Sequence, residues 1–305
     1  NAGSHLQLGD VRVGIYYASD EEAAGSVLTA QGDVTLTAGG TISEAGTDVD
    51  VDLVGDQITI SAHSGITGLE IAANELVSIQ TTLGDVELTE FDGSGETQPG
   101  LLVSSISAAS GSVAISAEGS LQATRAIAGH QSTGMVSLES RTGSLLIGER
   151  DTDGITLVKP PSLNSNEEAL EFSYGVSLRA AEMLDTYKFF DADGHLEYRA
   201  GGAFNFDLPE SLAADTIVLD SGPALKVDGT LTATELVSLS SDTNVYIVTG
   251  TVQTPSGGEV ANVQITARGL VDSTSAIYHE GTGLQKFEKI GDNTKLIYVA
   301  TSDDD

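Results

Sequence analysis

The sequence contains no cysteine and no tryptophan. Without cysteine the fold cannot depend on disulfide bonds, and thiolate catalysis is excluded. Absence of cysteine does not exclude secretion. No run of about 18 apolar residues occurs, so we expect no helical segment inserted in a membrane. Aromatic residues are only 5% of the chain, which leaves Val, Ile, Leu, Thr and Ser to build a core of short strands.

Basic residues are also scarce. The 305 residues include 13 Lys and Arg against 45 Asp and Glu, which gives a net charge of −32. Nucleic-acid backbones and anionic membrane surfaces require clustered basic side chains, so both are excluded as expected partners. The excess of carboxylates suits solubility, high salt or screening by divalent cations.

Several catalytic and targeting motifs are missing. The chain has no G-x-S-x-G elbow, P-loop or dinucleotide-binding fingerprint, and no secretion signal opens it. The histidines show no zinc-binding spacing; they are His63, His130, His195 and His279. The opening residues "NAGSH" look like a cloning scar, and His5 belongs to it. We therefore interpret residues 1–8 as a scar and lead-in, and the chain as a monomeric fragment of a longer protein.

Glycine is abundant, with 35 residues, and it marks a repeat. The segments "GDVTLTA", "GDQITISA", "GDVELTE" and "GSVAISA" share the pattern G-x-(V/I)-x-(L/I)-x-A, with slips of one residue. The successive spacings are 23, 23, 29, 27, 23, 20 and 21 residues. The repeats begin at Gly9, Gly32, Gly55, Gly84, Gly111, Gly134, Gly154 and Gly175.

A repeat of this length, with two or three alternating strands in each copy, indicates an all-β, right-handed parallel β-helix. Corresponding strands would stack about 4.8 Å apart in parallel sheets. An antiparallel sandwich is the competing fold, but the fixed glycine offset and the return of the repeat at every third strand disfavour it. One interior stack is expected to contain Leu36, Ile60, Leu88, Ile115 and Leu138.

The rhythm divides the chain into three parts after residue 8. We expect β-helix coils over 9–158, an aromatic-rich insertion over 159–214, and further coils with an acidic tail over 215–305. Within the insertion, "TYKFFDADGHLEYR" is typical of a β-hairpin whose turn is "DADG".

The quoted coils resemble those of filamentous-haemagglutinin-like giant secreted adhesins of bacteria. "GDVTLTAGGTI", "SGSVAISAEGSL" and "LEIAANELVSIQTTLGDVEL" carry the likeness, which covers residues 9–158 well and 213–300 loosely. The N-P-N-G secretion motif of that family is absent, so its secretion route does not follow. The resemblance implies an extracellular or cell-surface, rod-like segment of a large surface protein.

Two short motifs are candidate calcium sites. "DTDG" contains Asp151 and Asp153, and "DADG" contains Asp191 and Asp193; each motif places two carboxylates two residues apart before a glycine. Neither matches an EF-hand or a calcium-binding nonapeptide. The acids of "TDVDVD" at 47–52 are expected on the solvated outer face of a strand. No other cofactor is expected.

An aromatic cluster is the candidate ligand-binding platform, through stacking on sugars or as the small core of the expected hairpin. Its members are Tyr187, Phe189, Phe190 and Tyr198.

Two functions remain open. The first is a non-catalytic structural and adhesive module: a stiff rod that displays a lateral surface to cell-surface glycans or other surface proteins. The alternative is a β-helix enzyme that acts on carbohydrate, of polysaccharide lyase or epimerase type. Such an enzyme needs basic groups beside a carboxylate on one sheet face. The sequence offers one mild basic cluster, namely Arg125, His130, Arg141 and Arg150.

Overall fold

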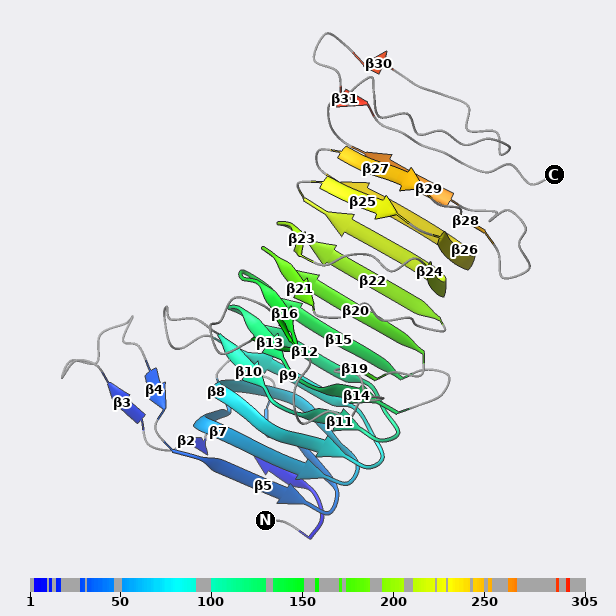
Figure 1. Cartoon of the computed structure of the whole chain (residues 1–305). Helices are drawn as coiled ribbons and strands as arrows, with labels where there is room; N and C mark the ends of the chain where they lie inside the picture. Colours follow the sequence, from blue (N-terminus) through cyan, green and yellow to red (C-terminus); the bar gives the residue numbers. More distant parts are fainter. Residues whose placement is uncertain are drawn as a thin grey trace. The chain divides into compact units, whose positions relative to one another are not determined.

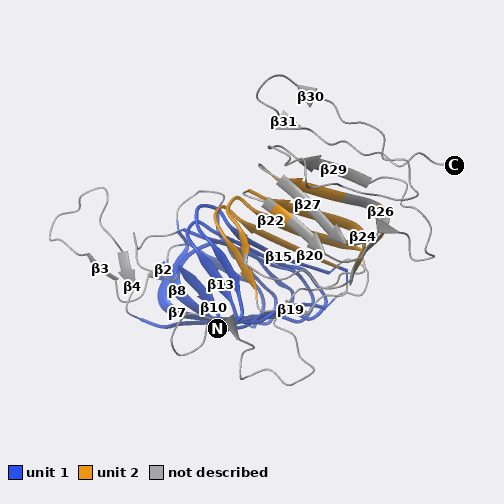
Figure 2. Cartoon of the chain, turned by 45° about the horizontal axis from the view of Figure 1, so that its top comes forward, with its two compact units in different colours: residues 1–174 blue, residues 175–305 orange. Residues whose placement is uncertain are grey.

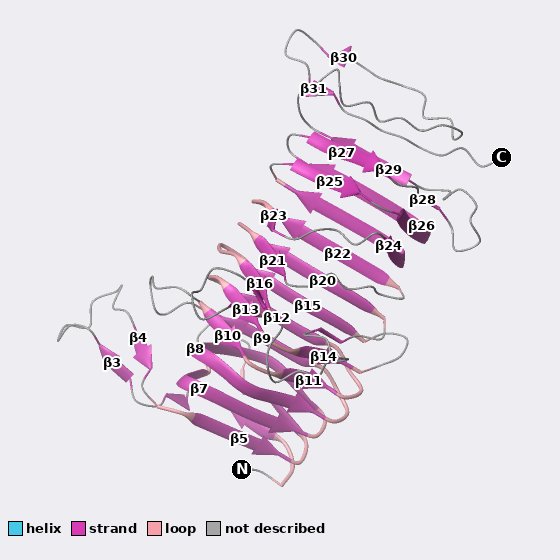
Figure 3. Cartoon of the chain, viewed as in Figure 1, coloured by secondary structure: helices cyan, strands magenta, loops and turns pink. Residues whose placement is uncertain are grey.

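The computed structural model consists of β-strands, turns and bends throughout its described part, with no helix there (Figure 3). No described segment is therefore a helix that could cross a membrane. The described residues are 3–9, 11–12, 15–17, 28–30, 32–46, 51–91, 100–129, 134–150, 157–158, 170–171, 174–186, 194–205, 211–222, 224–228, 230–241, 244–249, 252–253, 263–267, 289–290 and 295–296.

The chain divides into two compact units, residues 1–174 and 175–305 (Figure 2). In the first unit the chain winds through three stacks of parallel strands, making about six turns (Figure 1). The first stack is β1 (Leu6–Leu8), β6 (Thr41–Glu44), the start of β8 (Gly65–Thr81), β9 (Val86–Glu90), β12 (Val113–Ala117) and β15 (Met135–Ser140).

The other two stacks complete each turn. The second is β2 (Val11–Arg12), the start of β7 (Leu53–Ala62), the middle of β8, β10 (Leu101–Val103), β13 (Leu121–Ala123) and β16 (Leu145–Ile147). The third is β5 (Val34–Ala38), the ends of β7 and β8, β11 (Ile106–Ala108), β14 (Ala126–Ala128) and β19 (Leu170–Glu171). The predicted parallel β-helix is confirmed.

The core of this unit is formed by every second side chain along each strand, because alternate side chains point inward and outward. In β12 the residues at positions one, three and five are buried and the two between them are partly exposed. Because identical positions pair in register, Val113 lies between Val86 and Val136, and Ile115 lies between Leu88 and Leu138. Apolar side chains therefore form continuous columns along the stack of coils, which removes them from water on every side.

The prediction of a single interior stack is wrong at one point. Ile60 pairs with Leu36 and Ile79 in the third stack, whereas Leu88 pairs with Ile115 in the first. The physical reason is the 29-residue spacing between Gly55 and Gly84, which spans four strands instead of three. One whole coil is formed by β8, a 17-residue strand that bends at Gly68 with a positive φ of 65°. The repeat motif is thereby displaced to the next stack.

The second unit is also built from parallel coils. Its main stack is β20 (Gly175–Ala180), β22 (His195–Ala200), the later parts of β24 (Ser211–Ser221) and β26 (Thr230–Ser241), and β29 (Val263–Ala267). Its other parallel pairs include β21 (Leu184–Thr186) with β23 (Phe204–Asn205), β25 (Ala224–Asp228) with β27 (Asn244–Thr249), the start of β24 with the start of β26, and the start of β26 with β28 (Val252–Gln253).

These pairings bear on two sequence-based expectations and correct the first. Strand β22, the second arm of the expected hairpin, pairs in parallel on both sides, with β20 and β24; both its edges are therefore filled by coil strands. The turn over 191–194 lies outside the described residues except for Gly194. At the other end, β1 lies within the expected lead-in of residues 1–8 and pairs in parallel with β6.

The described residues also include antiparallel pairs. They are β3 (Ile15–Tyr17) with β4 (Leu28–Ala30), β17 (Glu149–Arg150) with β18 (Leu157–Val158), and β30 (Lys289–Ile290) with β31 (Lys295–Leu296).

Close contact between coils explains the glycine at some corners. A Cβ atom added to Gly84 would lie 2.1 Å from the carbonyl oxygen of Ser64 in the preceding coil. No side chain fits at that distance, so the backbones of successive coils can approach there only because the residue is glycine.

Candidate functional site

Most of the predicted ligand residues lie outside the described part of the chain. They are Asp151, Asp153, Tyr187, Phe189, Phe190, Asp191 and Asp193. The exception is Tyr198, which is fully buried, at 0% exposure, and faces the interior of the second unit. The stacking role predicted for Tyr198 is therefore wrong, because alternation along β22 turns this ring inward while its neighbours face outward.

The two described side chains of the expected basic cluster, those of Arg125 and Arg141, do not lie together. Arg125 follows β13, whereas Arg141 follows β15, so the two residues lie at different corners of the coils. Arg141 donates from Nη2 to the carbonyl oxygen of Glu90 over 3.0 Å and lies over the ring of Phe91, 5.1 Å from its centroid. It is therefore part of the local packing. His130 and the side chain of Arg150 lie outside the described residues.

Polar side chains on the outside of the first unit connect adjacent coils. Gln57 Nε2 and Ser104 Oγ donate to the two carboxylate oxygens of Glu75, over 2.9 and 2.5 Å. Asn74 Nδ2 donates to Asp56 Oδ1 over 2.7 Å. These contacts join residues 18 to 29 positions apart in sequence, so the acids on this surface stabilise the stacking of coils.

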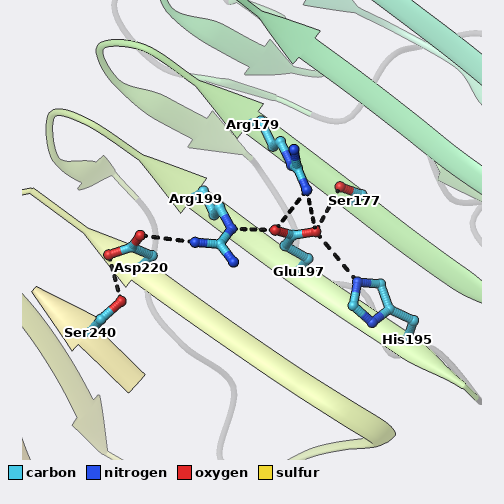
Figure 4. A network of polar contacts seen from close by, with 7 residues as sticks. All are labelled: Ser177, Arg179, His195, Glu197, Arg199, Asp220 and Ser240. Atoms are coloured by element: carbon cyan, nitrogen blue, oxygen red, sulfur yellow. Dashed lines mark hydrogen bonds and ion pairs between the residues drawn. The ribbon is translucent and has the colours of Figure 1, made fainter. Parts of the chain in front are cut away.

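The second unit carries a denser group of charges, which we call the Glu197 network (Figure 4). Leu196 and Tyr198 of β22 are buried inside the unit, so the residues that alternate with them face the opposite side of the sheet. The network consists of Ser177, Arg179, His195, Glu197, Arg199, Asp220 and Ser240.

Glu197 lies at the centre of the network and accepts from four side chains. Arg179 Nη2 is 3.0 Å from each carboxylate oxygen, and Arg199 donates from Nε. Ser177 Oγ lies 3.3 Å and His195 Nε2 lies 3.4 Å from Oε2. The carboxylate is only 6% exposed, so these donors replace the water that burial removed.

The arginines extend the network along the stack. Arg199 Nη1 contacts Asp220 Oδ2 over 3.2 Å, and Ser240 Oγ donates to Asp220 Oδ1 over 2.6 Å. Four neighbouring strands, β20, β22, β24 and β26, are thereby joined on one face (Figure 4). The side chains of Arg179 and Arg199 remain 49% and 45% exposed.

The surroundings keep Glu197 ionised. Burial alone would raise its pKa, but the hydrogen bonds from His195, Arg199 and Arg179 outweigh that effect and hold the pKa of Glu197 well below its usual range. The same carboxylate raises the pKa of Arg199. A carboxyl group held this strongly in its charged form is a poor proton donor and a poor proton acceptor near neutral pH.

A second cluster of acids lies in the first unit. Oxygen atoms of Glu44, Asp52 and Glu70 all lie within 4.8 Å of one another. Asp52 is 4% exposed and accepts from the backbone nitrogen of Glu70 through Oδ2 over 3.1 Å. The expectation that the acids of 47–52 are solvated is therefore wrong for Asp52, which belongs to a tight contact between coils.

Proximity of these acids favours a shared proton. Burial, the hydrogen bond with Asp52, and the negative charges of Asp52 and Glu44 together raise the pKa of Glu70 from 4.5 to about 7. Carboxylate oxygens are also the ligands of hard cations, but hydrogen bonding within the cluster needs no cation.

Both clusters were missed from the sequence. The signal for the Glu197 network was the spacing of 20 residues between "SLR" at 177–179 and "EYR" at 197–199, which puts equivalent residues on adjacent coils. Comparison with known proteins gives no further guide to either cluster: no protein-family model, no curated protein and no solved structure matches this chain.

Proposed function

We propose that the chain is a non-catalytic structural and adhesive module of a large secreted or cell-surface bacterial protein, whose stacked coils display a lateral binding surface. One observation carries the proposal. Described charged and polar side chains on the outer faces bind one another across adjacent coils, as in the Glu75 contacts and the Glu197 network. Such groups hold a scaffold together and are not arranged around a reacting atom.

The extracellular setting and the partners belong to the same proposal. A repeat without cysteine and with a net charge of −32 remains soluble and keeps its copies apart by repulsion. The resemblance of the coils to secreted adhesins supports display at a cell surface, with cell-surface glycans or other surface proteins as partners. A calcium ion at Asp151 and Asp153, or at Asp191 and Asp193, stays a prediction.

A carbohydrate-active enzyme is the second candidate, and one observation favours it. His195, Arg179 and Arg199 converge on Glu197 on one sheet face, and lyases and epimerases need basic groups beside a carboxylate. The geometry supports it less well, because Glu197 is buried and its donors hold it in the charged form, which makes it a poor proton donor and a poor proton acceptor for such chemistry.

Incubation with uronate-containing polysaccharides distinguishes the two. Unsaturated products would be followed by their ultraviolet absorbance, and C5 epimerisation by proton NMR, with and without Ca²⁺. The proposal expects no turnover under any condition. Turnover that disappears in both His195→Ala and Arg179→Gln would overturn it in favour of the enzyme, while Arg141→Gln serves as a matched control outside the network.

A further inference from the structure

Two arginines of the Glu197 network form a like-charged pair. Arg179 of β20 and Arg199 of β22 are register partners on adjacent parallel strands. Adjacent strands lie about 4.8 Å apart, and like charges directly opposite each other are destabilising unless another group compensates them. Glu197 supplies that compensation, since it binds both guanidinium groups.

Other contacts between coils show that stacking does not require this pair. Ser116 Oγ donates to Glu139 over 3.0 Å, and Gln57 pairs with Glu75 over 2.9 Å, in each case without a basic residue. A neutral donor opposite a single acid therefore also joins adjacent coils. Two half-exposed arginines on neighbouring coils call for a further explanation in a chain with only 13 basic residues.

Each guanidinium group retains donors for a ligand. Arg179 uses Nη2 for Glu197, which leaves Nε and Nη1, while Arg199 uses Nε and Nη1, which leaves Nη2. Acceptors for these remaining nitrogens are not found among the described residues. Because the buried carboxylate fixes both side chains, less conformational entropy is lost when they bind a ligand.

The positive charges of the network are also more open to solvent than its negative charges, in spite of the acidic chain. At physiological ionic strength charges are screened over about 8 Å, so distant carboxylates contribute little. Within the second unit, the described charged groups in contact with the pair are Glu197 and Asp220, with His195 beside Glu197. Glu197 is buried and paired with both arginines, and the side chain of Asp220 is 37% exposed, so the two arginines, at 49% and 45%, are the most exposed charges at this point.

From this geometry we propose that Arg179 and Arg199 bind an oxyanion, the carboxylate or sulfate group of an acidic polysaccharide. One such group can accept from both guanidinium groups, because the fork of arginine matches its paired oxygens and the strand spacing brings the forks together. This proposal rests on the proposed function and specifies the class of ligand. The displayed surface would recognise an acidic glycan through the carboxylate or sulfate groups of the glycan.

Isothermal titration calorimetry tests the site with the whole chain in 0.15 M NaCl. The probes are an oligogalacturonate for carboxylate, a sulfated oligosaccharide for sulfate, and a neutral dextran oligosaccharide as control. We expect saturable binding of at least one acidic probe and none of dextran. Arg179→Gln and Arg199→Gln should each weaken binding at least tenfold, whereas Arg141→Gln, at a corner of the first unit, should not change it.

Controls separate binding from folding. Arg179→Lys keeps the charge but loses the fork, so it should bind more weakly than the unaltered chain at an unchanged melting temperature. In the unaltered chain, the Nε–H signals of Arg179 and Arg199 should shift on titration, a readout that does not depend on variants.

Absence of binding by both acidic probes, or binding that Arg179→Gln and Arg199→Gln leave unchanged, would overturn the site. Neither result involves turnover, so failure of the site is distinguishable from failure of the non-catalytic proposal.

Discussion

The acid cluster of the first unit should make stability fall as the pH rises, in the reverse of the usual behaviour of buried carboxylates. Glu70 has a pKa raised from 4.5 to about 7 in the folded chain. Between these pH values the folded state keeps a proton that the unfolded state releases, so the free energy of unfolding decreases with increasing pH. The contribution is fully present below about pH 4.5 and is lost by about pH 7.

The magnitude follows from the same values. A rise from 4.5 to about 7 corresponds to about 3 kcal/mol, at about 1.4 kcal/mol per tenfold change in proton affinity. Glu70 is only partly buried, and solvent screening reduces the electrostatic part, so we expect about 1–2 kcal/mol. The charges that raise the pKa of Glu70 are those of Asp52 and Glu44, both in the preceding turn of the chain.

Glu70→Gln isolates this effect from the other acids. Glutamine imitates the protonated side chain, so the variant should match the unaltered chain at about pH 4 and exceed its stability by about 1–2 kcal/mol at about pH 8. Urea unfolding followed by circular dichroism at several pH values measures the difference. Glu87→Gln, at an exposed position of β9, is the matched control. A difference between unaltered chain and Glu70→Gln that does not change with pH would refute the reasoning.

Three further variants test the packing and the network. Leu88→Ala should destabilise by about 2–5 kcal/mol, because the columns of adjacent coils cannot refill the cavity, while Leu83→Ala, 54% exposed, should cost far less in the same urea titration. Glu197→Gln should cost about 3 kcal/mol at neutral pH by leaving two arginines face to face. Because its folded pKa is lowered, that cost should be complete above about pH 4.3 and shrink below it; a cost unchanged down to pH 3 would contradict the ion pairing. Gly84→Ala should lower the melting temperature by several degrees, since its Cβ would meet a carbonyl at 2.1 Å, whereas Gly9→Ala has no atom within 4 Å and should be neutral.

The fold could be predicted because the pattern of apolar residues in the repeat matches the pattern of buried side chains in the strands. In "GSVAISA" the alternation of Val113, Ile115 and Ala117 with small polar residues is the alternation of buried and outward side chains. The stack assignment was less secure, because the motif carries no mark that distinguishes the three stacks. Only the irregular spacing before Gly84 indicates the displacement, and β8 shows that an entire coil can form without the motif.

The candidate sites were harder to predict, because they depend on which coils are adjacent. Nothing within "VDVDLV" shows that Asp52 is buried; its burial follows from Glu70, 18 residues later, in the next turn of the chain. In the same way "HLEYR" was interpreted as a hairpin arm, since local turn residues precede it. The 20-residue register between Arg179 and Arg199 fixes it as a coil strand and brings the charges together.

Register between coils is the claim on which every site depends, and disulfide formation between introduced cysteines tests it directly. The structure pairs Thr59 with Ser78 and places Glu87 in a different stack, whereas simple alignment of the repeats would pair Thr59 with Glu87. Adjacent parallel strands place Cα atoms about 4.8 Å apart, within the range of about 4.4–6.8 Å for a disulfide. No native cysteine interferes. Oxidation should link Thr59→Cys to Ser78→Cys in the folded chain and leave Thr59→Cys with Glu87→Cys unlinked, as measured by mass spectrometry. The opposite result would contradict the fold described.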